Sequence, residues 1–211
     1  MPRVSREVAN ARREEIVNAC ASLYETMSFK DITMQEIAEA TSFKRPAIYN
    51  YFHTKEEIFL ALFQREYELW TEELNAITGN HESLTEDELA QELARSLEKR
   101  ERLLRLLSMN LYDMEENSRL DRLTEFKTAY GSSMKAVERC LEKFCPSMTA
   151  RDRQDFIYAF FPFVYGIYPY TFATEKQLKA KMAAGIEHVQ RSVYEMAYTC
   201  VKKLLKTANE Q

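Results

Sequence analysis

Residues 33–55 constrain this 211-residue chain more than any other stretch, because they contain two helix-start signals with a break between them. Thr33 is followed three positions later by Glu36, the spacing of a capping box, in which each side chain accepts a backbone N–H of the other residue. A second helix is predicted after the break at residues 41–43, with Pro46 in its first turn, where a missing N–H costs nothing. The stretch therefore predicts two short helices joined by a tight turn.

Helices also frame this stretch on both sides. Apolar residues recur at helical spacing over residues 11–27, after a loose arm at residues 1–10. Thr54 and Glu57 form a second capping-box pair, and a long helix is predicted from there to about Ile77. Ile48 and Phe52 lie four apart and are predicted to face the core. The two short helices are thus part of a larger helical unit.

The remainder of the chain also favours helices. Only 4 Gly and 5 Pro occur, 45% of the residues are hydrophobic, and no segment alternates as a strand would. We predict an all-α protein of about nine helices, with an N-terminal three-helix domain at residues 1–55 and a second helical domain at residues 56–211. The predicted helices of the second domain cover residues 85–98, 100–113, 118–144, 150–172 and 175–206.

Charge and cysteine content narrow the classes of function. The net charge is −4, with +1 on residues 1–55 and −5 on the remainder, which suits contact with a polyanion at one end only. The four cysteines form no CxxC pair and are predicted to be buried thiols, although a redox-sensing Cys140 or Cys145 stays open. No secretory signal or membrane span is expected, which favours a cytoplasmic protein. We expect no metal or cofactor, and the three histidines stand in no catalytic pattern, so an enzyme is not expected.

An ordered set of residues resembles the TetR (tetracycline-repressor-like) family of transcriptional regulators. The set comprises Ile16, Ala19, Leu23-Tyr24, Phe29, Thr33, Ile37-Ala38, residues 47–52 (AIYNYF) and residues 55–59 (KEEIF). Ser28 and Ser42 replace the glycines usual in the family, and Lys44 replaces a common serine. Because glycine at the turn supplies a positive φ, Ser42 predicts a strained or differently shaped turn. The resemblance implies helix-turn-helix DNA binding.

Outward-facing residues of the second short helix are the candidate DNA contacts. Arg45 is the candidate for guanine, Asn50 for adenine or a phosphate, and Pro46 and Ala47 for a thymine methyl, with Lys44 beside them. By the resemblance, Thr33, Tyr49, Tyr51 and Lys55 take phosphate-contacting positions. Simpler roles stay open, since Thr33 is also a cap, Tyr51 a partly buried side chain, and Arg45 and Lys55 surface charges.

An aromatic run marks the second domain. Nine of the 17 residues from Phe156 to Phe172 are Phe or Tyr, which indicates a core and dimer interface or, alternatively, a ligand pocket. The resemblance implies a small, often apolar ligand, although Glu115, Glu116 and Glu125 could favour a cation or simply be solvated. The candidate ligand residues are Met109, Tyr112, Phe126, Tyr130, Met134, Phe160, Phe163, Tyr165 and Tyr168.

The resemblance also implies a mechanism. Two chains would dimerise through C-terminal helices at residues 150–172 and 175–206, and place their recognition helices ~34–36 Å apart on a palindromic operator. A ligand would change that spacing and release a repressor from DNA. The alternative keeps the DNA-binding fold but replaces the small molecule with a protein partner.

Overall fold

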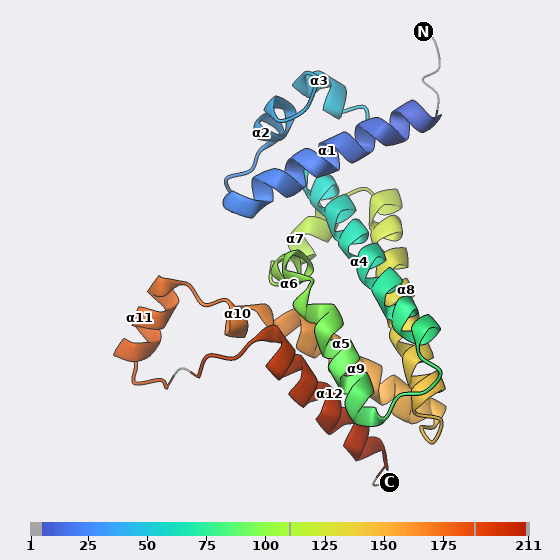
Figure 1. Ribbon diagram of the computed structural model, residues 1–211. Coiled ribbons are helices and arrows are strands. Elements are labelled where there is room, and N and C mark those ends of the chain that lie inside the picture. The colour runs from blue at the N-terminus through green and yellow to red at the C-terminus, as the bar shows by residue number, and fades with distance from the viewer. Residues whose placement is uncertain (1–5, 110, 188, 210–211) are drawn as a thin grey trace. The chain divides into compact units, whose positions relative to one another are not determined.

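The computed structural model describes residues 6–109, 111–187 and 189–209 and contains 12 α-helices (Figure 1). No strand occurs in these ranges, which confirms the predicted all-α class. The described residues divide into two compact units. The head unit takes those of Met1–Arg65 and Asn110–Ala129, and the body unit takes those of Glu66–Met109 and Tyr130–Gln211.

The head unit is built on α1, against which α2 packs, with α3 packed on α2 (Figure 1). Ile37, Ile48 and Phe52 are fully buried, so the predicted inward face of the two short helices is confirmed. Thr33 caps α2 in the predicted capping box. The elements of this unit are α1 (Arg6–Thr26), α2 (Met34–Glu39), α3 (Arg45–Ile48), α7 (Leu111–Glu116) and the beginnings of α4 (Lys55–Asn80) and α8 (Leu120–Phe144).

The body unit is a helical bundle in which α12 packs on α5 and α9. Leucines on one face of α5 and α6 are buried, and Trp70, Phe160 and Phe161 add aromatic rings to this core. Thr85 and Thr149 start α5 and α9 with complete capping boxes. Besides the later parts of α4 and α8, the unit contains α5 (Glu86–Glu98), α6 (Glu101–Leu107), α9 (Ala150–Gly166), α10 (Tyr168–Thr171), α11 (Glu175–Ala183) and α12 (Val193–Asn209).

Several predicted helix boundaries were wrong. The predicted helix at residues 175–206 is two helices, because Gly185 takes φ +68°, which ends α11. The predicted helices 100–113 and 150–172 are also each divided, into α6 and α7 and into α9 and α10. The chain is already helical at Arg6, within the predicted loose arm, whose first five residues lie outside the described ranges. In the part that the structure describes, no helix has the length and hydropathy needed to cross a membrane.

Candidate nucleic-acid interface

The start of α2 is held by a reciprocal contact between Thr33 and Glu36. The Glu36 N–H donates to the Thr33 hydroxyl at 3.4 Å, and the Thr33 N–H donates to the Glu36 carboxylate at 2.9 Å. The Thr33 hydroxyl also contacts that carboxylate and keeps the pKa of Glu36 below its ordinary value. A phosphate at Thr33 would therefore have to replace the carboxylate of Glu36.

The turn between α2 and α3 is shaped without glycine. No non-glycine residue of the described ranges has a positive φ, so Ser42 is not in the left-handed region. Its N–H donates to the carboxylate of Glu15 on α1, and this bond lowers the pKa of Glu15. The turn thus forms without a residue in the left-handed region, and α1 supports it.

The N-terminal end of α3 presents two cations to solvent. Lys44 is the N-cap residue, but its side chain makes no capping hydrogen bond. Arg45 is exposed and donates from Nη2 to the Tyr49 hydroxyl at 3.0 Å, with its guanidinium carbon 5.8 Å from the centre of the Tyr49 ring. Arg45 and Tyr49 are four residues apart, so the tyrosine holds the guanidinium on the outward side of α3.

The candidate DNA-contacting residues differ in exposure. Thr33, Lys44, Arg45, Pro46, Tyr49 and Asn50 are exposed, whereas Ala47, Tyr51 and Lys55 are partly exposed. The Tyr51 hydroxyl accepts from Nη1 of Arg12 at 3.5 Å. The structure therefore gathers most of the candidates on α3 and its flanks.

Lys55 has an intramolecular role that its sequence position does not reveal. Its ammonium donates to the backbone carbonyl of Phe29 at 2.8 Å and to that of Ile32 at 3.0 Å. The same nitrogen lies 4.2 Å from the centre of the Phe29 ring. Lys55 thus ties the start of α4 to the connection between α1 and α2.

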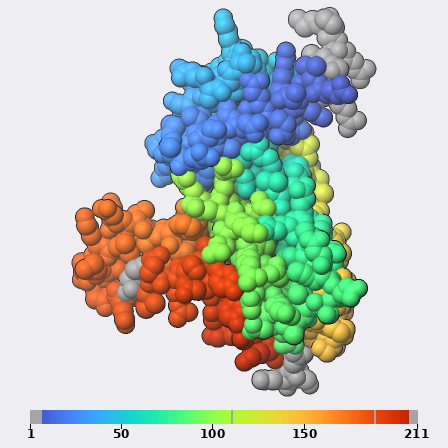
Figure 2. All heavy atoms as spheres, in the orientation of Figure 1, coloured from blue at the N-terminus to red at the C-terminus, as the bar shows by residue number. Residues whose placement is uncertain are grey.

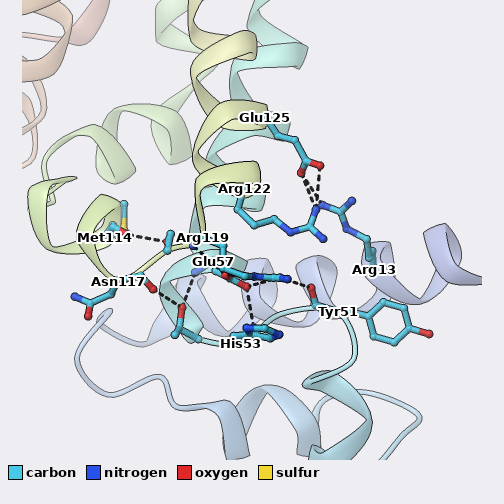
Figure 3. Close-up of polar contacts among 11 residues, drawn as sticks. Arg13, Tyr51, His53, Glu57, Met114, Asn117, Arg119, Arg122 and Glu125 are labelled. Atoms are coloured by element: carbon cyan, nitrogen blue, oxygen red, sulfur yellow. Dashed lines mark hydrogen bonds and ion pairs between the residues drawn. The ribbon is translucent and has the colours of Figure 1, made fainter.

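A buried ion pair joins α4 to the start of α8 within the head unit (Figure 3). Glu57 is 1% exposed, and its carboxylate accepts from Nε of Arg119 at 2.6 Å and from Nη2 at 2.9 Å. The backbone N–H groups of His53 and Arg119 donate to it at 2.8 and 3.1 Å. Burial alone would raise the pKa of Glu57, but the hydrogen bonds from Arg119 and His53 lower it to about 2.

This pair also orients the residues between α3 and α4. Nη2 of Arg119 donates to the Tyr51 carbonyl at 3.3 Å, and the Thr54 hydroxyl donates to the Asn117 carbonyl at 3.0 Å. The predicted capping box at Thr54 is therefore only half formed. The Glu57 N–H donates to the Thr54 hydroxyl, but the Glu57 carboxylate serves His53 and Arg119 instead.

Two further arginines enclose Phe52, the buried residue between α3 and α4. The guanidinium carbons of Arg13 and Arg122 lie 5.5 and 5.7 Å from the centre of the Phe52 ring. Glu125 joins them, since Nη2 of Arg13 donates to it at 3.1 Å and Nη1 of Arg122 at 2.8 Å (Figure 3). Glu115 has a cation partner as well, Lys127. Glu115 and Glu125, two of the carboxylates considered for a cationic ligand, are thus already paired with lysine or arginine side chains of the same chain.

Sequence reasoning did not find these supporting residues. Arg119 and Glu57 are 62 positions apart, and Arg13 and Glu125 are 112 apart. Periodicity and capping motifs report neighbours within a few residues, so they carry no signal for such pairs. Only the charged composition of residues 113–125 hinted at a role in ion pairing.

The candidate ligand residues are divided between the units. Tyr112, which is 86% exposed, and the buried Phe126 belong to the head unit, and the other seven belong to the body unit. Tyr130 packs edge-on against Phe161, with ring centres 5.6 Å apart, and the Tyr67 hydroxyl donates to Tyr165 at 3.5 Å. Burial raises the pKa of Tyr67 and Tyr130. Tyr130, Phe160 and Tyr165 therefore belong to one aromatic cluster with Tyr67, Trp70 and Phe161.

The other candidate ligand residues of the body unit are Phe163, Tyr168, Met109 and Met134. Tyr168 stacks on Phe172, with ring centres 4.7 Å apart. Phe163 lines a surface cavity formed with α12. Met109 and Met134 are partly exposed.

Comparison with known proteins shows which families the two parts of the sequence match. Residues 16–62 match the family of bacterial regulatory proteins of the tetR type, and residues 64–201 match the tetracyclin repressor-like C-terminal domain. The HTH-type transcriptional regulator YfiR of Bacillus subtilis is 30% identical over 63 residues, which are 30% of this chain and 31% of that relative. The match thus spans about a third of the curated relative.

Solved structures share the fold over most of the chain. A TetR/AcrR-family regulator from Thermobifida fusca superposes with a TM-score of 0.61 and 17% identity, covering 92% of this chain and 97% of that one. FadR of Thermus thermophilus, a TetR-family repressor in complex with lauroyl-CoA, gives 0.57 and 20% identity, covering 92% and 93%. Because one family domain alone matches more than half of the sequence, the chain belongs to the TetR family of DNA-binding transcriptional regulators.

Proposed function

We propose that this regulator reads its operator with the N-terminal end of α3, and that Arg45 makes the principal base contact. The supporting observation is the exposed pair of Lys44 and Arg45 at the start of α3, with Ile48 and Phe52 anchoring the opposite face in the core. Arginine pairs with guanine through two parallel hydrogen bonds in the major groove. Pro46, Ala47, Tyr49, Asn50 and Tyr51 complete the surface, with Thr33 and Lys55 at its edges.

The operator is a palindrome read by two copies of the chain, whose recognition helices lie ~34–36 Å apart. Residues 1–55 carry a net charge of +1 and the remainder −5, which suits contact with DNA through the N-terminal residues alone. On this proposal the protein represses transcription when it is bound to its operator. It is a cytoplasmic protein.

Selection of binding sequences from a random DNA pool tests this proposal. The selected sequence should be a palindrome, and Arg45→Ala should weaken its binding by roughly 10- to 100-fold while relaxing selection at one base pair. Arg95→Ala is the matched control, since Arg95 is an exposed arginine on α5 paired with Glu92. No enrichment of any sequence at low salt, or equal affinities for the two variants, would exclude this role for Arg45.

The proposed effector is a small, largely apolar molecule taken up by the body unit. The aromatic cluster around Tyr130 and Tyr165 supports this class, since its rings are apolar and its hydroxyl groups could orient a ligand. FadR of Thermus thermophilus, which shares the fold, is a repressor in complex with lauroyl-CoA. Fatty acyl-CoA esters are therefore the first compounds to test.

Thermal-shift measurements with acyl-CoA esters of increasing chain length address this effector. A ligand at 100 times its Kd should stabilise the chain by about 2.7 kcal/mol and should weaken operator binding. Free coenzyme A is the control for the acyl chain. If neither acyl-CoA nor other apolar compounds stabilise a chain that binds its operator, control by a protein partner becomes the better proposal.

A further inference from the structure

Helix α3 is too short to hold its own orientation. It has only four residues, and its N-cap residue Lys44 makes no side-chain capping bond. Isolated helices shorter than about 12–15 residues are marginal in water, because the first turn fixes several residues for one hydrogen bond. Ile48 and Phe52 anchor the inward side in the core. The direction in which Lys44 and Arg45 point therefore also depends on the residues that precede α3.

Two hydrogen bonds that involve side chains support the turn before α3. The Thr41 hydroxyl donates to the Ala38 carbonyl at 2.8 Å, just after α2 ends. The Ser42 N–H donates to the carboxylate of Glu15, which lies 27 positions earlier on α1. The first bond is local, whereas the bond to Glu15 ties the turn to another helix.

The position of Glu15 on α1 is itself fixed by the core. Glu15 directly precedes Ile16 and Val17, which are 0% and 4% exposed. Figure 2 shows α1 (dark blue) lying against the lighter blue segment that contains α2 and the turn. Arg12 lies beside Glu15, one turn earlier on the same helix, and donates to the Tyr51 hydroxyl at 3.5 Å. Helix α1 therefore contacts the chain both before and after α3.

The charge of Glu15 opposes contact with DNA. Affinity for DNA depends largely on cations that neutralise phosphates, and a carboxylate near that surface repels them. The hydrogen bonds from Ser42 and the neighbouring charge of Arg12 lower the pKa of Glu15, so this side chain is ionised at neutral pH. Any gain that Glu15 brings to operator binding therefore comes through the turn.

We propose that Glu15 is a positioning residue for operator recognition, which holds the turn at Ser42 and thereby orients Lys44 and Arg45 toward the major groove. It replaces two features that this segment lacks, a glycine in the turn and a capping side chain at position 44. Glu15 acts through the backbone of Ser42 and not by contact with DNA. The inference rests on the proposed reading of the operator by α3, and it adds a residue of α1 on which that reading depends.

Removal of the carboxylate tests the proposal, because a positioning role and a purely electrostatic role predict opposite signs. Glu15 is only partly buried, so Glu15→Ala should fold. It should weaken binding to the selected operator by about tenfold, as expected for one misplaced base contact, and leave binding to a scrambled duplex unchanged or slightly tighter. If Glu15 acted through its charge alone, both affinities would rise.

Glu14→Ala is the matched control for the lost charge. Glu14 is the neighbouring carboxylate on α1, is 64% exposed, and pairs with Arg65 at 3.7 Å instead of with the turn. Its removal takes the same charge from the same helix and should not weaken operator binding. A difference between the two alanine variants therefore reports the bond to Ser42.

Glu15→Gln separates the hydrogen bond from the charge. Its side-chain carbonyl still accepts from the Ser42 N–H, so its operator affinity should stay within about threefold of the wild type. Amide hydrogen exchange, measured by NMR on the chain without DNA, follows the bond itself. The Ser42 N–H should exchange at least about tenfold faster in Glu15→Ala than in Glu14→Ala.

Three outcomes would overturn the role of Glu15. Equal operator affinities of Glu15→Ala and Glu14→Ala, with Arg45→Ala still weakened, would remove it and leave the reading by α3 intact. Equal losses of affinity in Glu15→Gln and Glu15→Ala would show that the hydrogen bond is not the cause. A wild-type chain that selects no DNA sequence would remove the proposed function and this role together, so the two failures are distinguishable.

Discussion

The carboxylate of Glu57 and the guanidinium of Arg119 form a twofold contact at 2.6 and 2.9 Å between residues 62 positions apart. Glu57 belongs to the first turn of α4, and Arg119 directly precedes α8. The same guanidinium donates to the Tyr51 carbonyl, just after α3. One side chain therefore holds the start of α4, the start of α8 and the residues that follow α3 together.

Arg119→Met should destabilise the chain by about 3 kcal/mol at pH 7, because it leaves the 1%-exposed Glu57 as an uncompensated buried charge. Urea unfolding measures the loss, and Arg119→Lys should recover part of it. Arg95→Met is the matched control, since the exposed pair of Arg95 with Glu92 is worth at most about 1 kcal/mol.

The dependence of this loss on pH identifies Glu57 as its source. In the wild type, hydrogen bonds lower the pKa of Glu57 to about 2 from an ordinary 4.5. Its contribution to stability is therefore complete above pH 4.5 and disappears as the pH falls toward 2. In Arg119→Met, burial favours the neutral acid, so the difference between variant and wild type should narrow on acidification. A difference that stays constant between pH 7 and pH 3 would contradict this assignment.

Lys55→Met should lower the free energy of unfolding by about 1–3 kcal/mol, because the carbonyls of Phe29 and Ile32 lose their ammonium donor. The salt dependence of operator binding is the second measurement. If Lys55 also contacts a phosphate, as the sequence predicts, the slope of log K against log salt falls by about 1. Lys44→Met provides the comparison, with a change in slope expected and stability altered by less than about 0.5 kcal/mol.

Local signals in the sequence predicted the parts of the fold that short-range chemistry determines. The capping box at Thr33 is present as its spacing predicts, and Ile48 and Phe52 are buried as their four-residue separation predicts. Two helix breaks were missed: the end of α6 near Ser108 has no Gly or Pro beside it, whereas the division at Ile167 lies between Gly166 and Pro169.

Long-range partners were outside the reach of such signals. Glu57 has the spacing of a capping residue, and only the fold brings Arg119 to its carboxylate. Lys55 was predicted to contact a phosphate or to be a surface charge, because nothing in its neighbourhood predicts that the Phe29 and Ile32 carbonyls converge on it. Exposure of α11 was likewise hidden, because its apolar spacing is the same as that of a buried helix.

Ser96→Ala should lower the free energy of unfolding by about 1–3 kcal/mol. The reason is that the Trp70 indole N–H donates to the Ser96 hydroxyl at 3.0 Å and both residues are buried. Ser133→Ala is the matched control, since Ser133 is equally buried but its hydroxyl only donates to a carbonyl of its own helix. Trp70 is the only tryptophan, so its fluorescence reports the change at this site. Equal losses of unfolding free energy in the two variants would show that the destabilisation does not come from removing the acceptor of the Trp70 indole N–H.

The buried thiols should resist alkylation, which tests the redox role left open for Cys140 and Cys145. Burial raises the pKa of Cys140, and it raises that of Cys145 to about 11 and that of Cys20 to about 12. A higher pKa means a smaller thiolate fraction, so iodoacetamide at pH 8 should modify these three residues at least roughly 100-fold more slowly than in the urea-unfolded chain. Mass spectrometry of timed samples resolves each site, and modification of Cys140 or Cys145 at the unfolded rate would reopen the sensor role.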